Sequence, residues 1–161
     1  MSEDWEPVLQ AAATSVFTTM LSFKVEFAPL VENFFDGEKH IAGAVGFTGV
    51  YSAIIYVYSS AAFARRMTSS LLGMPEEEIQ EDEMVNDAIG ELTNMVAGHI
   101  KSNLNNQGKD CVMTIPTVVR GHDFRIEPVS GVHRQSVFFN CNGGRVLVEA
   151  LIKEGASKKE Q

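Results

Sequence analysis

The sequence predicts an α+β domain in which long helices pack on an antiparallel sheet. Apolar residues recur every three or four positions in three segments, a spacing typical of amphipathic helices. Elsewhere, apolar runs of strand length occur in pairs, separated by turn residues such as Asn142-Gly143-Gly144, as in antiparallel hairpins. Each half of the chain has a helix followed by paired strands, which suggests an internally duplicated unit although no residue-level repeat is evident.

The helices are predicted at residues 5–21, 61–72 and about 81–105. The second helix is expected to end at Gly73, because a glycine followed closely by Pro75 is the usual stop signal. Six of the eight residues after this proline are acidic. We interpret them as a solvated helix start, since carboxylates in a first turn stabilise the helix by about 0.3–1 kcal/mol each.

The predicted strands span residues 41–47, 50–58, 112–119, 124–129, 137–141 and 145–152, with a short additional strand allowed within 23–31. Thr48-Gly49 supplies the turn residues of the first hairpin. We expect one domain over residues 1–152, followed by a polar C-terminal tail at 153–161.

Charge and targeting signals limit the classes of partner. The formal net charge is -8, which disfavours nucleic acid and anionic membrane because binding to either relies on basic residues. Residues 41–64 lack formal charges and are long enough to span a bilayer, but their glycine, serine and tyrosine content favours strands. The acidic N-terminus does not resemble an export signal, and the two cysteines form no C-x-x-C motif. We therefore expect a cytoplasmic protein without a membrane partner.

The third helix has two contrasting faces. One face is apolar and is predicted to face the core; it comprises Val85, Ala88, Ile89, Leu92, Val96 and Ile100. On the opposite side, a polar row of Asp87, Glu91, Asn94 and Gly98 falls within an arc of about 60°.

This polar row opposes the local stability of the helix. Asp87 and Glu91 are like charges one turn apart, and Asn94 is a poor mid-helix residue. Gly98 costs about 1 kcal/mol relative to alanine in a helix interior and would leave a notch that another backbone can approach. Residues that reduce the stability of a helix without a compensating contact in the fold indicate a functional site.

The pattern Asp87-x-x-x-Glu91-x-x-Asn94-x-x-x-Gly98 resembles the active-helix signature of the CheC/CheX/FliY family of chemotaxis phosphatases. The length, the N-terminal helix and the glycine-rich hairpin also resemble the CheX branch, so the resemblance covers nearly the whole chain and implies a CheC-like fold. In CheC two helices carry Glu-x-x-Asn, whereas this chain has no asparagine before Asn33. The departure favours one site per chain.

The resemblance implies that the substrate is the aspartyl phosphate of a CheY-like receiver domain in two-component signalling. Asn94 would orient the attacking water, and Glu91 would pair with the lysine of the receiver's active site. Asp87 and Gly98 are assigned to partner docking. Magnesium is expected on the regulator, with no metal or cofactor in this chain. A homodimer paired through a continuous sheet would cover the uncharged segment 112–119.

Two other functions are compatible with the sequence. The chain could be an adaptor that binds a receiver domain or a flagellar-switch component without hydrolysis, or a small-molecule hydrolase that uses its histidines and acids. The histidines are His40, His99, His122 and His133, and none is paired at the i,i+3 or i,i+4 spacing of a helical metal site. His99 is interpreted as a residue at the core edge, and Cys111 and Cys141 as small buried apolar residues.

Overall fold

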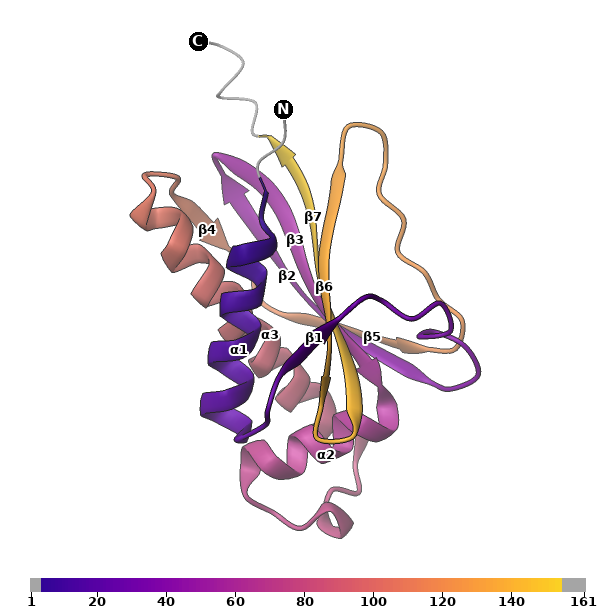
Figure 1. The fold of residues 1–161 in the computed structure, drawn as a ribbon. Coiled ribbons are helices and arrows are strands. Elements are labelled where there is room, and N and C mark those ends of the chain that lie inside the picture. Colours follow the sequence, from indigo (N-terminus) through magenta and orange to yellow (C-terminus); the bar gives the residue numbers. More distant parts are fainter. Residues whose placement is uncertain (1–3, 155–161) are drawn as a thin grey trace.

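The computed structural model describes residues 4–154, which form three α-helices and a seven-stranded antiparallel sheet (Figure 1). The helices are α1 (Glu6–Leu21), α2 (Ala61–Leu72) and α3 (Asp82–Asn106), with a short 3-10 helix, η1 (Glu76–Glu78), before α3. The strands are β1 (Glu26–Ala28), β2 (His40–Gly49), β3 (Tyr51–Ser60), β4 (Cys111–Met113), β5 (Thr117–Gly121), β6 (His133–Cys141) and β7 (Gly144–Glu154). The predicted α+β class is therefore confirmed.

The order of strands in the sheet reflects the two halves of the chain. The order is β1-β6-β7-β3-β2-β4, with β5 also paired to β2. Exchanging β1 with β4, β2 with β6 and β3 with β7 gives the same order in reverse, so each of these six strands has a counterpart in the other half. Strand β5 lies outside this correspondence. Helices α1 and α3 are counterparts in the same sense and contact each other. The topology thus supports the duplicated helix-plus-strands unit.

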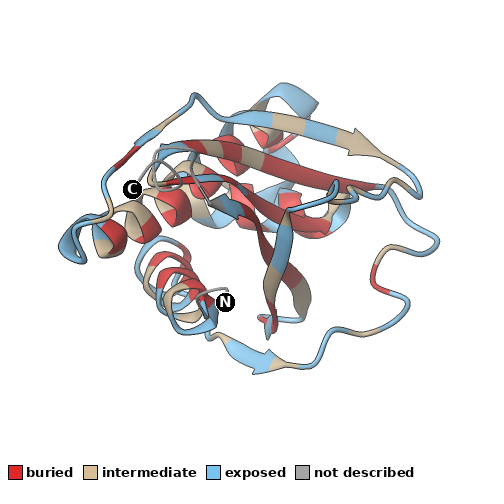
Figure 2. Cartoon of the chain, turned by 90° about the horizontal axis from the view of Figure 1, so that it is seen from above, coloured by how far each residue is buried: buried red, intermediate tan, exposed pale blue. Residues whose placement is uncertain are grey.

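Helices α1 and α3 cover one face of the sheet, and α2 packs against one end of this layer (Figure 1). The main core lies between helices and sheet, where Figure 2 shows mostly buried segments. All six residues predicted for the core face of the third helix are buried. The 3.6-residue period thus predicts correctly which side of α3 packs on the sheet.

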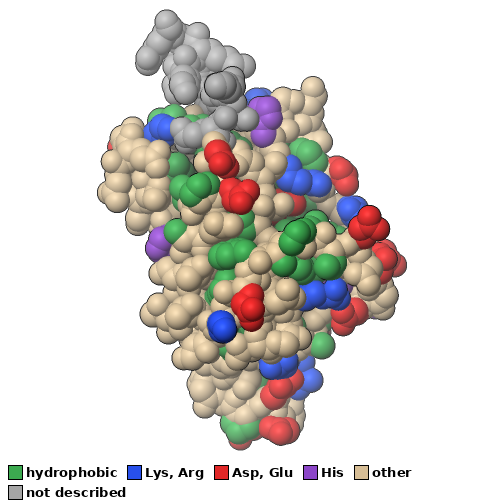
Figure 3. Space-filling view, in the orientation of Figure 1, with side chains coloured by type: hydrophobic (Ala, Val, Ile, Leu, Met, Phe, Trp, Pro, Cys, Tyr) green, Lys and Arg blue, Asp and Glu red, His purple; other side chains and the backbone are tan. Residues whose placement is uncertain are grey.

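The opposite face of the sheet is covered by loops in place of helices. A smaller apolar cluster there includes Phe34, Tyr58, Phe138 and Leu151, and residues of the loops after β1 and β5 pack against it. At the β1 edge, Phe27 and Leu30 are 36% and 48% exposed, and Figure 3 shows apolar side chains gathered over β1 and the start of the following loop.

Three strand predictions need correction. The predicted strand 112–119 is divided into β4 and β5, and Pro116, which has no N–H to donate, lies between them. Just before it, the backbone N–H of Thr114 donates a hydrogen bond to the Gly46 carbonyl, and the Thr114 hydroxyl accepts one from the Gly46 N–H. Residues 124–129, predicted as a strand, form an irregular segment whose Ile126 carbonyl accepts a hydrogen bond from Arg134 (2.6 Å). The first hairpin turns at Val50, later than Thr48-Gly49.

The structure also bears on the predicted C-terminal tail and on the uncharged stretch that is long enough to span a bilayer. Strand β7 continues through residues 153 and 154, which were expected in the polar tail; residues 155–161 and the first three residues of the N-terminus lie outside the described part. The uncharged stretch 41–64 forms β2, β3 and the start of α2. Across residues 4–154 we find no helix with the length and apolarity needed to cross a membrane.

A buried carboxyl group on the loop-covered face predicts a pH effect on stability. Glu149 is 5% exposed; its Oε1 accepts a hydrogen bond from the Tyr58 hydroxyl (3.3 Å), and its Oε2 lies 3.4 Å from Nε of Arg134. Burial raises the pKa of Glu149 above its ordinary 4.5, and Glu127 adds to the rise, although Arg134 and Tyr58 lower it. The folded state therefore holds this proton more tightly than the unfolded state. The resulting contribution to stability is full in acid and is lost as pH rises from 4.5 through the raised pKa.

We expect Glu149→Gln to reduce this pH dependence of the unfolding free energy, because glutamine does not titrate. Urea unfolding of wild type and variant between about pH 4.5 and 7 measures it. Glu32→Gln, at an exposed loop position, is the control. Equal slopes for wild type and Glu149→Gln would contradict the assignment.

Candidate functional site

The polar row predicted on the third helix lies on the outward side of α3. Asp87 and Glu91 are exposed, while Asn94 and Gly98 are partly buried. Within residues 4–154, the side chains of Asp87, Glu91 and Asn94 form no hydrogen bond or ion pair with another residue. Two carboxylates and a carboxamide are therefore presented on one helix face with their polar atoms available to a binding partner.

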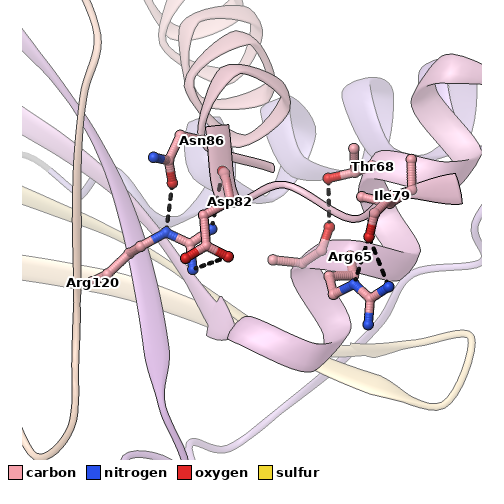
Figure 4. Close-up of polar contacts among 7 residues, drawn as sticks. Arg65, Thr68, Ile79, Asp82, Asn86 and Arg120 are labelled. Atoms are coloured by element: carbon pink, nitrogen blue, oxygen red, sulfur yellow. Dashed lines mark hydrogen bonds and ion pairs between the residues drawn. The ribbon is translucent and has the colours of Figure 1, made fainter. Parts of the chain in front are cut away.

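The start of α3 is fixed to the sheet by Arg120 of β5 (Figure 4). Nε of Arg120 donates a hydrogen bond to Oδ1 of Asn86 (2.6 Å), and its NH2 group donates to the carbonyl of Asp82 (3.3 Å). The guanidinium also lies 3.7 Å from the Asp82 carboxylate. These contacts fix the first turns of α3, next to the turn that carries Asp87.

The acidic segment before α3 is held through its backbone. Arg65 of α2 donates hydrogen bonds to the carbonyls of Ile79 (2.7 and 3.2 Å) and Glu76 (3.2 Å), while Thr68 bonds within α2 to the Ala64 carbonyl (Figure 4). All six acidic residues of the run are exposed, which confirms their interpretation as solvated. Three of them, however, lie in η1 and only two in the first turn of α3.

The fold itself does not require glycine at position 98. A Cβ added to Gly98 would have no neighbour within 4 Å, and no positive φ is recorded for this helical residue. The cost of about 1 kcal/mol for glycine in a helix interior is thus not offset by packing within the described chain. This observation supports a role for the notch toward a partner.

Gly98→Ala is accordingly expected to stabilise the protein by about 1 kcal/mol, raising Tm by roughly 2–4 °C, and to weaken binding of the partner. Thermal unfolding and a titration with the partner measure the two effects. Ser102→Ala, at an exposed position of the same helix, is the control for stability alone. Unchanged partner affinity in Gly98→Ala would exclude Gly98 from the docking surface.

Helix α1, the counterpart of α3, lacks an equivalent site. The exposed residues at four- and three-residue spacing on α1 are Pro7, Ala11, Thr14 and Thr18. None carries a carboxylate or carboxamide. Within residues 4–154, the outward face of α1 therefore offers no counterpart to Glu91 and Asn94 of α3.

The four histidines lie in different parts of the fold: β2, α3, the segment after β5, and β6. His40 is 2% exposed, and its Nδ1 donates to the carbonyl of Glu38 (3.0 Å). His99 is partly buried and its Nδ1 has no hydrogen-bond partner within the described chain, in agreement with a position at the core edge. His122 and His133 are exposed. No three His, Cys, Asp or Glu side chains among residues 4–154 converge as metal ligands.

Both cysteines are free and buried, as the sequence predicts. Burial raises the pKa of the Cys141 thiol to about 12, which outweighs the opposite effect of Arg66. Burial also raises the pKa of Cys111. The reactive thiolate is therefore scarce at neutral pH, and neither residue is suited to nucleophilic catalysis.

The anchoring contacts of α3 could not be predicted from the sequence. Arg120 and Asn86 are 34 residues apart, and no motif or periodicity connects them. Only the pairing of β5 with β2 brings Arg120 beside the start of α3.

Comparison with known proteins identifies the family. Residues 41–140, which include all of α3, match the family model described as chemotaxis phosphatase CheX. The chain belongs to the CheX family. This result confirms the resemblance carried by the polar row and the glycine-rich hairpin.

Individual members of the family agree with this assignment. The chain is 40% identical over 84 residues to the CheY-P phosphatase CheX of Thermotoga maritima. That alignment covers 52% of this chain and 53% of the relative, so it spans about half the length of each. The chemotaxis protein CheX from Vibrio vulnificus superposes with a TM-score of 0.78 at 23% identity, covering 94% of this chain and 97% of the other.

A third relative was crystallised with a partner. The CheX–CheY–BeF3–Mg2+ complex from Borrelia burgdorferi contains a chain that matches with a TM-score of 0.72 and 25% identity. The match covers 94% of this chain and 99% of that one. The helices-on-sheet architecture is thus shared along nearly the full described length.

Proposed function

We propose that this member of the CheX family is a phosphatase that hydrolyses the aspartyl phosphate of a CheY-like receiver domain. One observation carries the proposal: the side chains of Glu91 and Asn94 lie on the outward side of α3, without a polar partner among residues 4–154, in a chain of this family. The relatives named as a CheY-P phosphatase and as a complex with CheY support the choice of substrate.

Asn94 is the catalytic residue in this proposal. Phosphoryl transfer passes through a loose transition state, so a catalyst gains mainly by positioning the attacking water and stabilising charge. The carboxamide of Asn94 offers an acceptor oxygen for the water and donor hydrogens for other groups, and it does not act as a base at neutral pH. Its role is analogous to that of the water-orienting glutamine of GTPases.

Glu91, one turn before Asn94, pairs with the active-site lysine of the receiver. An exposed ion pair contributes little, but the contribution grows when docking removes water from around it. Asp87, one turn before Glu91, and the notch at Gly98, one turn after Asn94, support docking of the receiver. Magnesium belongs to the regulator, as it accompanies the CheX–CheY complex from Borrelia burgdorferi. The chain would thus complete the active site of its partner in the cytoplasm.

The proposal is tested by measuring the loss of phosphate from a panel of phosphorylated receiver domains with and without this protein. Faster decay of at least one receiver is expected. Binding of a receiver without faster decay would favour a non-catalytic adaptor. Hydrolysis of small phosphate esters without any receiver would favour a small-molecule hydrolase.

We also propose that the chain forms a homodimer through the β4–β5 edge of the sheet. Val112, Ile115 and Val119 along this edge are 70%, 81% and 43% exposed, an unusual exposure for apolar residues on an edge that can pair with another chain. The wild type is expected to sediment as a dimer, and Ile115→Asp as a monomer because burial of an unpaired carboxylate is costly. Glu81→Asp, at an exposed position outside this edge, is the control; a wild-type monomer would refute the dimer.

A further inference from the structure

Helix α3 approaches the sheet closely where Thr93 lies over Gly43 of β2. Gly43 belongs to the face of β2 that is directed toward the helices, between Ile41 and Val45. A Cβ built on Gly43 would overlap Oγ1 of Thr93, and would lie 3.0 Å from the Thr93 Cβ and 3.2 Å from Cγ2 of Ile89. Any side chain at position 43 would therefore force α3 or Thr93 to move.

Thr93 is suited to this close contact although it carries a hydroxyl group. Thr93 is 0% exposed, and its Oγ1 donates a hydrogen bond to the carbonyl of Ile89 (2.7 Å). The hydroxyl is therefore satisfied within the helix and can lie against the strand without an unpaired polar atom. Its β-branched side chain also has few rotamers, so it forms a rigid contact.

The contact lies directly beneath the polar row. Thr93 immediately precedes Asn94 and follows Glu91 by two residues, and it lies on the buried side of the same helical turn. A helix turn moves as a unit, so the depth at which Thr93 rests on Gly43 determines the height and rotation of the Asn94 carboxamide. In contrast, Gly46 on the same strand faces Thr114, away from α3.

We propose that Gly43 and Thr93 are positioning residues for catalysis, which set where Asn94 holds the attacking water. The inference rests on the proposed phosphatase function. Water positioning tolerates little displacement, since an error of about 1 Å can reduce a rate roughly 100-fold. Docking of a receiver depends on a broader surface and should tolerate the same displacement better.

The experiment compares Gly43→Ala, Thr93→Ala and the double variant in receiver dephosphorylation. For Gly43→Ala we expect kcat to fall at least roughly tenfold, with affinity for the BeF3-activated receiver within about threefold of wild type. Thr93→Ala should lower kcat by a smaller factor, because it removes the contact of the Thr93 side chain with Gly43 without introducing a clash. The double variant removes the overlapping Oγ1 and should recover a substantial part of the kcat lost in Gly43→Ala.

Gly121→Ala is the matched strand control, because its added Cβ would meet Phe124 at an ordinary 3.7 Å; it should retain wild-type kcat. Should Gly43→Ala fail to fold, as judged by thermal unfolding, Thr93→Ala and the double variant still measure the contact. Wild-type kcat in Thr93→Ala or Gly43→Ala, or a double variant no better than Gly43→Ala, would overturn the positioning role while leaving the phosphatase intact. A wild type that accelerates no receiver would instead refute the proposed function, and the positioning role with it.

Discussion

Asn94→Ala is expected to lower receiver-stimulated phosphate release by roughly 100-fold or more, because the water loses the group that orients it. Affinity for the phosphorylated receiver should stay close to that of wild type, since Asn94 acts on the water more than on the partner. The decay of phosphate on the receiver, followed at matched protein concentration, measures turnover. Titration with the BeF3-activated receiver measures binding.

Asn105→Ala is the control for replacing an asparagine in α3, because Asn105 is exposed in the last turn and lies outside the polar row. It should behave as wild type in both assays. Wild-type turnover in Asn94→Ala would remove this residue from the catalytic step. A parallel loss of binding and turnover would reassign Asn94 to docking.

Glu91→Ala is expected to weaken receiver binding and turnover together. An ion pair that becomes desolvated in a complex can cost about 2 kcal/mol or more when one partner is removed, which corresponds to roughly 30-fold in affinity. Because Glu91 is exposed in the free protein and has no partner within residues 4–154, its loss should leave stability nearly unchanged. Receiver titrations and urea unfolding of the same variant separate these effects.

The partner of Glu91 can be identified by a double-mutant cycle with the receiver's active-site lysine. If the two groups pair, the combined replacement costs less than the sum of the single replacements. Glu77→Ala, at an exposed acidic position in η1, controls for the general loss of negative charge. Additive losses in the cycle, or equal losses in Glu77→Ala and Glu91→Ala, would contradict a specific pair.

The helices and the two faces of α3 follow from local sequence patterns. Periodicity predicts the third helix at 81–105, and it spans Asp82–Asn106; the second helix has its predicted bounds, 61–72. Periodicity also separated the buried residues, such as Leu92, from the polar row. This was possible because the period of a helix is a local property that fixes the relative direction of every side chain. The candidate site lies on one helix and could therefore be predicted in the same way.

The contacts that attach α3 to the sheet, in contrast, depend on the tertiary structure. The contacts of Arg120 with α3 join residues distant in sequence. The division of 112–119 likewise involves the contact of Thr114 with the distant Gly46, in addition to the local effect of Pro116. Gly43 shows the limit most clearly, since the sequence places it in a predicted strand but does not indicate that Thr93, 50 residues later, lies against it. Local patterns specify which way a side chain points, whereas its neighbour depends on the pairing and packing of the whole chain.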